Sequence, residues 1–65
     1  MKVNTNKVKL ILAEQELTMT AFAKNSGVSR QNISIIFARG TCNPVTAGKL
    51  AKGLGVPVAE IVKED

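Results

Sequence analysis

Three glycines divide the chain into short segments in which apolar residues recur at helical spacing. Gly27, Gly40 and Gly55 each follow such a segment, and a glycine just past the last helical turn adopts the left-handed conformation without penalty. A helix-capping residue follows each of the first two glycines, Ser29 in one case and Asn43 in the other. No segment alternates apolar and polar residues for long, which argues against strands. The pattern therefore predicts an all-α fold of five short helices.

The glycine stops and capping residues predict four helices, at residues 7–16, 19–26, 30–39 and 44–54. Pro57 starts a fifth short segment. Either Thr5 or Asn6 caps the first helix, and Thr18 caps the second. One face of each helix is apolar and forms the expected core. Its members are Val8, Ile11, Leu12, Phe22, Ala23, Ile33, Ile36, Phe37, Ala47, Leu50, Ala51 and Leu54.

Four further positions in these helices bear on the packing. Gln15 falls on the apolar stripe of the first helix, whereas Leu10 lies off it and is either a second packing face or exposed. Gly48 and Gly53 lie inside the fourth helix, where a glycine weakens a helix by roughly 1 kcal/mol relative to alanine. A glycine at such a position also permits the close approach of another helix.

The length predicts one domain, residues 1–65, with little stability to spare. A single core in so short a chain rarely supplies more than about 3–5 kcal/mol. Cys42 is the only cysteine and there is no histidine, so neither a disulfide nor a structural zinc site is available. Stability therefore comes from tight helix packing or from a second subunit.

The residues available for catalysis are few. Without histidine or tyrosine, the usual general bases at neutral pH are missing. Glu14 and Glu16 are two apart and so point to different faces of a helix, and the other acids gather at the C-terminus. Cys42 has no base positioned to activate it, and a loop residue is a better interpretation of it than a redox switch. We expect no enzyme, no cofactor and no metal site.

The charge is positive and unevenly distributed. The formal net charge is +4, with eight basic and two acidic residues in positions 1–59 and one basic and three acidic residues in positions 60–65. A basic body suits a polyanionic partner, although ordinary solubility charge is the simpler alternative. The first nine residues are polar and basic and no apolar run is long enough to span a membrane, so we expect neither a signal peptide nor an anchor. A lone cysteine fits a reducing cytoplasm.

Residues 19–37 have the features of a helix, a three-residue turn and a second helix. The helix crossing needs a small residue, which Ala23 supplies, and the turn needs a residue that accepts positive φ, which Gly27 supplies. Val28 fills the turn. The apolar face of the second helix, with Ile33 and Ile36, packs against Phe22. This order of features predicts a helix-turn-helix.

At these residues the chain resembles the Xre/Cro/cI-type helix-turn-helix DNA-binding domains. The spacing from Ala23 to Gly27 to Ile33 matches that family's pattern, and the runs at 27–34 and 49–56 are similar to its recognition-helix entry and its fourth helix. The resemblance covers about residues 7–62 and implies a lambda-repressor-like fold that binds duplex DNA. It also points to regulators of phages and mobile elements.

The chain departs from the family pattern at three places. Met19 stands where the family often has glutamine, and Ile35 stands where a polar base-reading side chain is common. The end of the third helix, residues 37–40, is one residue longer than is usual. A base contact from Ile35 is therefore apolar, and none is expected from Met19.

The resemblance implies that the third helix enters the major groove with its N-terminal end first. Arg30 suits guanine, Gln31 or Asn32 suits adenine, and Ile35 suits a thymine methyl group. Gln31 points directly away from the core and is the leading base reader, followed by Arg30 and Ser34. Asn32 lies toward the flank and can instead touch a phosphate. The alternative is a solvated first turn, with Ile35 as incidental surface or a protein contact.

Other polar residues are candidates for contacts with the DNA backbone. Thr18 and the free amides beside it favour phosphate, although Thr18 is also useful as a plain cap. The full set of backbone candidates is Thr18, Ser29, Arg39, Thr41, Asn43 and Lys49. The alternative for Lys49 and Lys52 is that they face solvent and make no contact with DNA. A basic arm of Lys2, Lys7 and Lys9 would add to the grip.

The leading hypothesis is a sequence-specific transcriptional regulator that acts as a repressor. A single module covers only about 600–1,000 Å² of DNA, so we expect a homodimer on two half-sites about 34 Å apart. Val58, Ile61 and Val62 either form the dimer face or complete the core. A protein-interaction module of the same fold, such as an antitoxin, is the alternative, because Ile35 and Ala38 lie on the outward face of the third helix.

Overall fold

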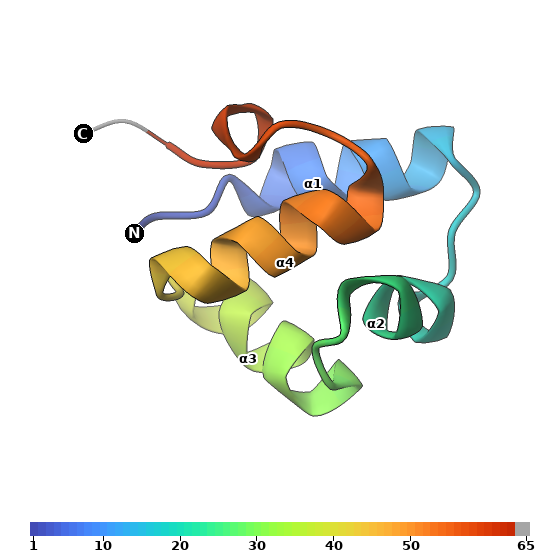
Figure 1. The fold of residues 1–65 in the computed structure, drawn as a ribbon, viewed down its shortest axis with the longest axis horizontal. Coiled ribbons are helices and arrows are strands. Elements are labelled where there is room, and N and C mark those ends of the chain that lie inside the picture. The colour runs from blue at the N-terminus through green and yellow to red at the C-terminus, as the bar shows by residue number, and fades with distance from the viewer. Residues whose placement is uncertain (64–65) are drawn as a thin grey trace.

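Four helices and a terminal 3-10 turn make up the computed structural model, which describes residues 1–63 (Figure 1). The elements are α1 (Thr5–Glu14), α2 (Met19–Ser26), α3 (Arg30–Arg39), α4 (Pro44–Leu54) and η1 (Val58–Glu60). The all-α prediction is confirmed, and the fifth expected helix is a single 3-10 turn.

Local capping explains why α2, α3 and α4 begin and end where the sequence predicts. The side chain of Thr18 accepts a hydrogen bond from the Ala21 amide, and Ser29 and Asn43 cap α3 and α4 in the same way. Gly27, Gly40 and Gly55 end the three helices with φ of 73°, 74° and 71°. Each cap satisfies backbone groups that the helix end would otherwise leave unpaired.

The first helix lies two residues earlier than expected. Neither Thr5 nor Asn6 is its cap, because the Asn4 side chain accepts the Lys7 amide at 3.1 Å. At the other end Glu16 adopts φ 53°, the left-handed conformation that glycine takes elsewhere in this chain. This conformation lets the Leu17 amide bond to the Leu12 carbonyl at 2.9 Å.

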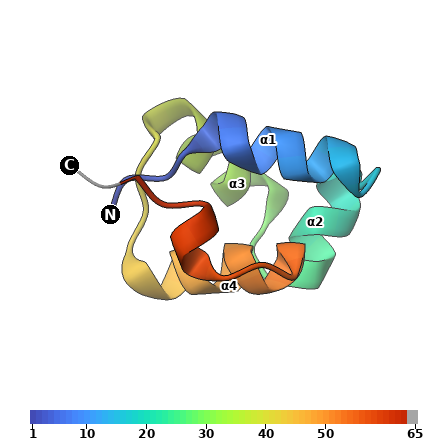
Figure 2. The ribbon, with the colours of Figure 1, turned by 90° about the horizontal axis from the view of Figure 1, so that it is seen from above.

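The core lies between α1 and α4, which run along opposite sides of the molecule in Figure 2, and α2 closes one end. The largest side chains that are fully buried are Phe22, Ile33, Leu50, Leu54, Ile61 and Val8. Phe37 and Ala23 are half-buried and pack against this core. Ile61 is fully buried and Val62 packs against the core, so these two complete it, and Val58 stays exposed. Leu10 is 61% exposed.

A close contact between α2 and α4 depends on a glycine. A Cβ at Gly53 would lie 2.7 Å from the Ser26 Cβ and 2.8 Å from its Cα. The expectation of close approach is therefore right for Gly53 and wrong for Gly48, where a Cβ would meet nothing within 4 Å. Sequence analysis did not identify Ser26, whose buried hydroxyl bonds the Ala23 carbonyl and the Val28 amide. On α1, Gln15 donates to the Leu54 carbonyl at 2.6 Å and ties the end of that helix to α4.

Residues 1–3 form bridges to two other segments of the chain. Lys2 pairs with Thr41 and Val3 with Val62, both antiparallel. Val3 is only 2% exposed and fixes this segment to the core. The first residues are therefore no free arm, and the expected basic arm is wrong.

The two lysines of α1 that were assigned to this arm also have partners within the molecule. The Lys7 ammonium lies 3.7 Å from a carboxylate oxygen of Glu60, and that of Lys9 lies 5.6 Å from the centre of the Phe37 ring. The first contact directs the Lys7 charge toward η1, and the second places the Lys9 charge against the end of α3, so neither lysine belongs to a free arm.

Candidate nucleic-acid interface

The turn between α2 and α3 fixes the orientation of α3. It consists of Gly27, Val28 and Ser29, and the Val28 side chain is buried within it. The inner face of α3 carries Ile33, which is fully buried in the core cluster that also holds Phe22. With its inner face held in this way, α3 presents its other side to solvent.

That outer face carries the predicted base readers. Arg30, Gln31, Asn32 and Ser34 are all exposed, and Ile35 is 41% exposed. Within residues 1–63, no hydrogen bond or ion pair occupies the four polar side chains. The bond from Asn32 to the Ser29 hydroxyl uses the Asn32 backbone amide, so the side-chain donors and acceptors of this face are available to a partner.

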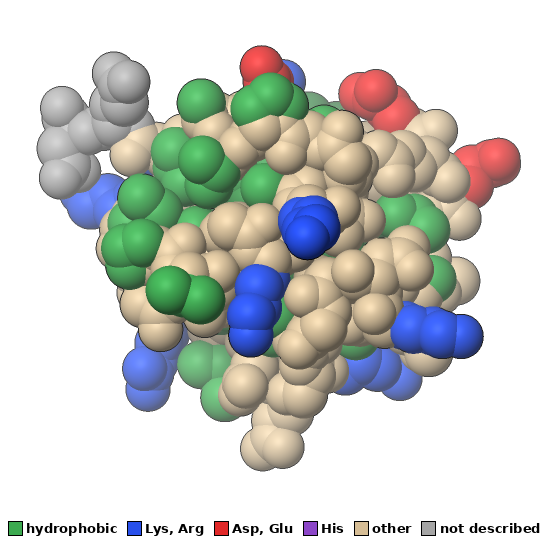
Figure 3. All heavy atoms as spheres, in the orientation of Figure 1, with side chains coloured by type: hydrophobic (Ala, Val, Ile, Leu, Met, Phe, Trp, Pro, Cys, Tyr) green, Lys and Arg blue, Asp and Glu red, His purple; other side chains and the backbone are tan. Residues whose placement is uncertain are grey.

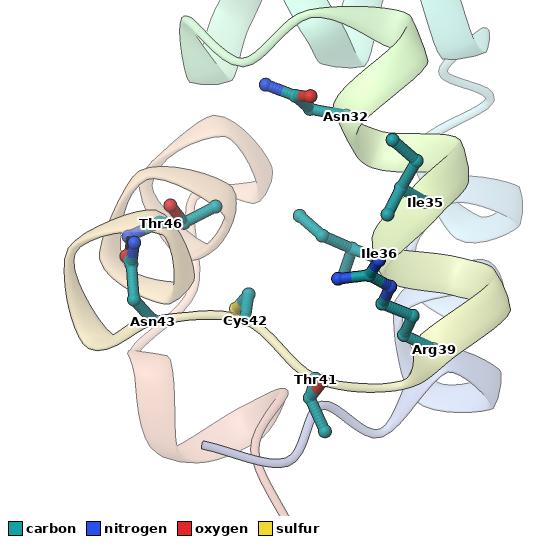
Figure 4. Close-up of a pocket in the computed structure, with 8 residues that line it drawn as sticks. All are labelled: Asn32, Ile35, Ile36, Arg39, Thr41, Cys42, Asn43 and Thr46. Atoms are coloured by element: carbon teal, nitrogen blue, oxygen red, sulfur yellow. Dashed lines mark hydrogen bonds between the residues drawn. The ribbon is translucent and has the colours of Figure 1, made fainter.

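A groove of about 220 Å³ lies between α3 and the start of α4 (Figure 4). We call it the α3–α4 groove. Its walls are Asn32, Ile35, Ile36 and Arg39 from α3, Thr41 and Cys42 from the connecting loop, and Asn43 and Thr46 from α4. In Figure 4 Asn32 and Arg39 reach in from one side, and Thr46 faces them from the other. The lining therefore combines polar side chains with the apolar side chains of Ile35 and Ile36.

Three of the predicted backbone residues meet in this groove, namely Arg39, Thr41 and Asn43. Thr18 and Ser29 lie apart from it, where each caps the start of its helix, and Lys49 lies exposed on α4 without lining the groove. Sequence analysis missed Thr46 and Cys42 as lining residues. For Thr46 a signal was present, because the cap at Asn43 places it in the first turn of α4.

Cys42 lies at the base of the groove and is partly buried. This burial raises the pKa of its thiol, so the thiol stays protonated at neutral pH. A protonated thiol is a poor nucleophile, which agrees with the interpretation of Cys42 as a loop residue.

Charge is separated across the molecule. Residues 17–59 hold five basic residues, Lys24, Arg30, Arg39, Lys49 and Lys52, and no acidic one. Figure 3 shows the acidic side chains at the upper and right margins, over η1 and the end of α1, with basic side chains across α4 and below it. The helices that form the groove and the exposed face of α3 therefore make up a uniformly positive part of the molecule, as a polyanion site requires.

Comparison with known proteins identifies the family. The model of a helix-turn-helix family matches residues 8–61, from the first helix to just past η1. No curated protein and no solved structure gives a significant match. Within residues 1–63, no helix combines the length and apolar character needed to cross a membrane. Proteins of this family bind DNA and are not enzymes. The chain thus belongs to the helix-turn-helix family of the Xre/Cro/cI type, and DNA is its partner.

Proposed function

We propose that the protein is a sequence-specific transcriptional regulator that acts as a repressor, with residues 1–65 as one DNA-binding domain. The observation that carries the proposal is the outer face of α3, where four polar side chains are exposed and have no partner among residues 1–63, on a helix whose inner face is buried. Repression by occupying a promoter needs only a DNA-binding surface. A cytoplasmic location accords with an unpaired Cys42 thiol, since free cysteines persist in reducing compartments.

In this proposal α3 lies in the major groove and reads bases directly. Gln31 is the leading reader and pairs with adenine, while Arg30 donates two hydrogen bonds to guanine. Ser34 and Asn32 supply further polar contacts, and Ile35 packs on a thymine methyl group. Each good bidentate pair discriminates by about 1–3 kcal/mol.

The DNA backbone is held on both sides of α3. One strand runs along the α3–α4 groove, which Arg39, Thr41 and Asn43 line and into which the Arg39 guanidinium points in Figure 4. Thr18 and Ser29 hold phosphates at the starts of α2 and α3, whose first amides favour anions. Lys49 adds a longer-range attraction from α4.

We propose that two copies bind together on two half-sites. A single module of this size buries too little DNA surface for high specificity, and a symmetric pair doubles that surface. Ile61 and Val62 serve the core, so of the three predicted residues only Val58 remains a candidate for contact between copies, and the exposed Val45 of α4 is a further one.

The alternative of a protein-interaction module rests on Ile35, which is 41% exposed, and on Ala38, which is exposed one turn later on the same face. The two functions differ in what covers α3. If α3 binds a protein such as a toxin, replacement of its polar first turn will leave that complex intact, whereas DNA binding will be lost.

The test is selection of bound duplexes from a random library, followed by titration of the selected and scrambled duplexes. Gln31→Ala is expected to reduce the preference for the selected sequence by about 5- to 150-fold and to leave affinity for scrambled DNA nearly unchanged. Asn25→Ala, which removes an exposed amide of α2 that is not among the proposed DNA contacts, is the matched control and should behave as wild type. If Gln31→Ala selects the same sequence with the same preference, the proposed recognition face is wrong.

A further inference from the structure

The loop between α3 and α4 is hydrogen-bonded to the first residues of the chain. The Val3 amide donates to the Gly40 carbonyl at 2.8 Å, and the Cys42 amide donates to the Met1 carbonyl at 3.0 Å. The Met1 nitrogen donates in turn to the Cys42 carbonyl at 2.8 Å. These three bonds hold the loop along residues 1–3, which we call the N-terminal strap.

The other edge of the strap is held by the C-terminal segment. The Lys63 amide donates to the Lys2 carbonyl at 3.0 Å, and the Asn4 amide, just past the strap, donates to the Ile61 carbonyl at 2.7 Å. Val3 is buried and Ile61 is fully buried, so both segments are fixed to the core. The strap therefore joins the loop to an anchored part of the fold.

The same loop forms one wall of the α3–α4 groove through Thr41 and Cys42 and ends at Asn43, which lines it too. No residue of the strap lines the groove. In Figure 4 the N-terminal ribbon passes beside the loop at Thr41, outside the hollow that Arg39 and Thr46 enclose. The strap thus touches the wall of the groove from behind.

We infer that the N-terminal strap positions the groove for DNA and so sets DNA affinity without contacting DNA. The inference rests on the proposed function of the groove. A loop that is ordered before binding loses little conformational freedom when the DNA arrives, whereas a loose loop must be ordered by the DNA at the expense of affinity. Val3 is the principal positioning residue, because it bonds the loop and is itself buried.

The experiment replaces single backbone amides by esters in the 65-residue chain made by chemical synthesis. An ester at Val3 removes the N–H that bonds Gly40 and weakens the Lys2 carbonyl as an acceptor. An ester at Lys63 removes the whole bond to that carbonyl and leaves the loop bonds intact, so it is the matched control. Affinity is titrated on the selected duplex, and the rate at which iodoacetamide alkylates Cys42 reports the freedom of the loop.

The Val3 ester is expected to bind the duplex about fivefold more weakly, the equivalent of one backbone hydrogen bond, and to react faster at Cys42. The Lys63 ester is expected to stay within about twofold of the unmodified protein in both measurements. Equal losses in the two esters would indicate general loosening and overturn the inference, as would full affinity in the Val3 ester. Failure of the unmodified protein to bind any duplex would instead contradict the proposed function.

Amide hydrogen exchange provides a test that needs no variant and therefore no assumption about folding of the esters. In the free protein the Cys42 amide should exchange at least about 100-fold more slowly than an unprotected amide, because the strap already holds the loop. Exchange at the unprotected rate in free protein, with slowing only on addition of DNA, would show that DNA and not the strap orders the loop.

Discussion

Two residues of this chain, Ser26 and Glu16, have structural roles that their side-chain type alone does not predict. Ser26 is a small polar residue at the end of a helix, and sequence analysis gives it no role in the core, yet it is buried against Gly53 of α4. Glu16 is charged and exposed, yet its backbone adopts the left-handed conformation that reverses the chain after α1. Both facts depend on how segments meet in space, which no local pattern encodes.

Replacement of Gly53 by alanine tests the contact between α2 and α4. The added Cβ would lie within 3.0 Å of three Ser26 atoms, two of them backbone, so overpacking should outweigh the gain in helix propensity and cost roughly 1–2 kcal/mol of unfolding free energy. Gly48→Ala is the matched control in the same helix, and it should stabilise by about 1 kcal/mol since its Cβ meets open space. Urea denaturation measures both, and a stabilised Gly53→Ala variant would contradict the packing described here.

Glu16 provides a second matched pair. Glu16→Gly should raise the free energy of unfolding by roughly 1 kcal/mol, because glycine adopts positive φ without the steric cost borne by other residues. Glu14→Gly, two residues earlier in the last turn of α1, removes the same charge and should lower it by about 1 kcal/mol. The midpoint temperatures of thermal unfolding of the two variants should therefore shift in opposite directions. Shifts in the same direction would mean that loss of the charge, rather than backbone conformation, determines the change in stability.

At the scale of elements, the sequence predicts those helix ends that are determined by neighbouring residues. The bounds of α2, α3 and α4 agree with prediction because a capping side chain and a glycine stop mark each end within a few residues. The start of α1 was misplaced because several polar residues that can cap a helix follow one another there, and Asn4 rather than Thr5 or Asn6 is the one that accepts the amide bond. The polar face of α3 was predictable from helical spacing, whereas the α3–α4 groove was not, since two helices and a loop must be placed together to form it.

The groove predicts different roles for two basic residues of neighbouring helices. Arg39 lines it, so Arg39→Ala should weaken binding to selected and scrambled duplexes alike and lower the slope of log K against log salt concentration by about one. Lys52 on α4 lies outside it, and Lys52→Ala removes the same charge with a smaller effect on both quantities. Fluorescence titrations over a series of salt concentrations make the comparison. Identical slopes for the two variants would show that only total charge matters.

At the scale of the whole molecule, the fold separates its charges and leaves one helix face free. The acidic residues that the structure describes lie at α1 and η1, while α2, α3 and α4 carry only basic ones. The strap is hydrogen-bonded to the groove loop and also to the C-terminal segment. A positive body of this kind should draw in duplex DNA from a distance, and the exposed first turns of α3 should then make the contacts that choose a sequence.

The most direct test of that arrangement is an NMR titration of the labelled protein with its selected duplex. The account predicts that the largest shift changes, and the strongest protection from solvent, fall on the amides and side chains of residues 30–35 and 39–46. Small changes are expected over α1 and η1. Changes confined to α1 and η1, with the side chains of Arg30 and Gln31 unaffected at saturation, would contradict the claim that the outer face of α3 is the surface that reads DNA.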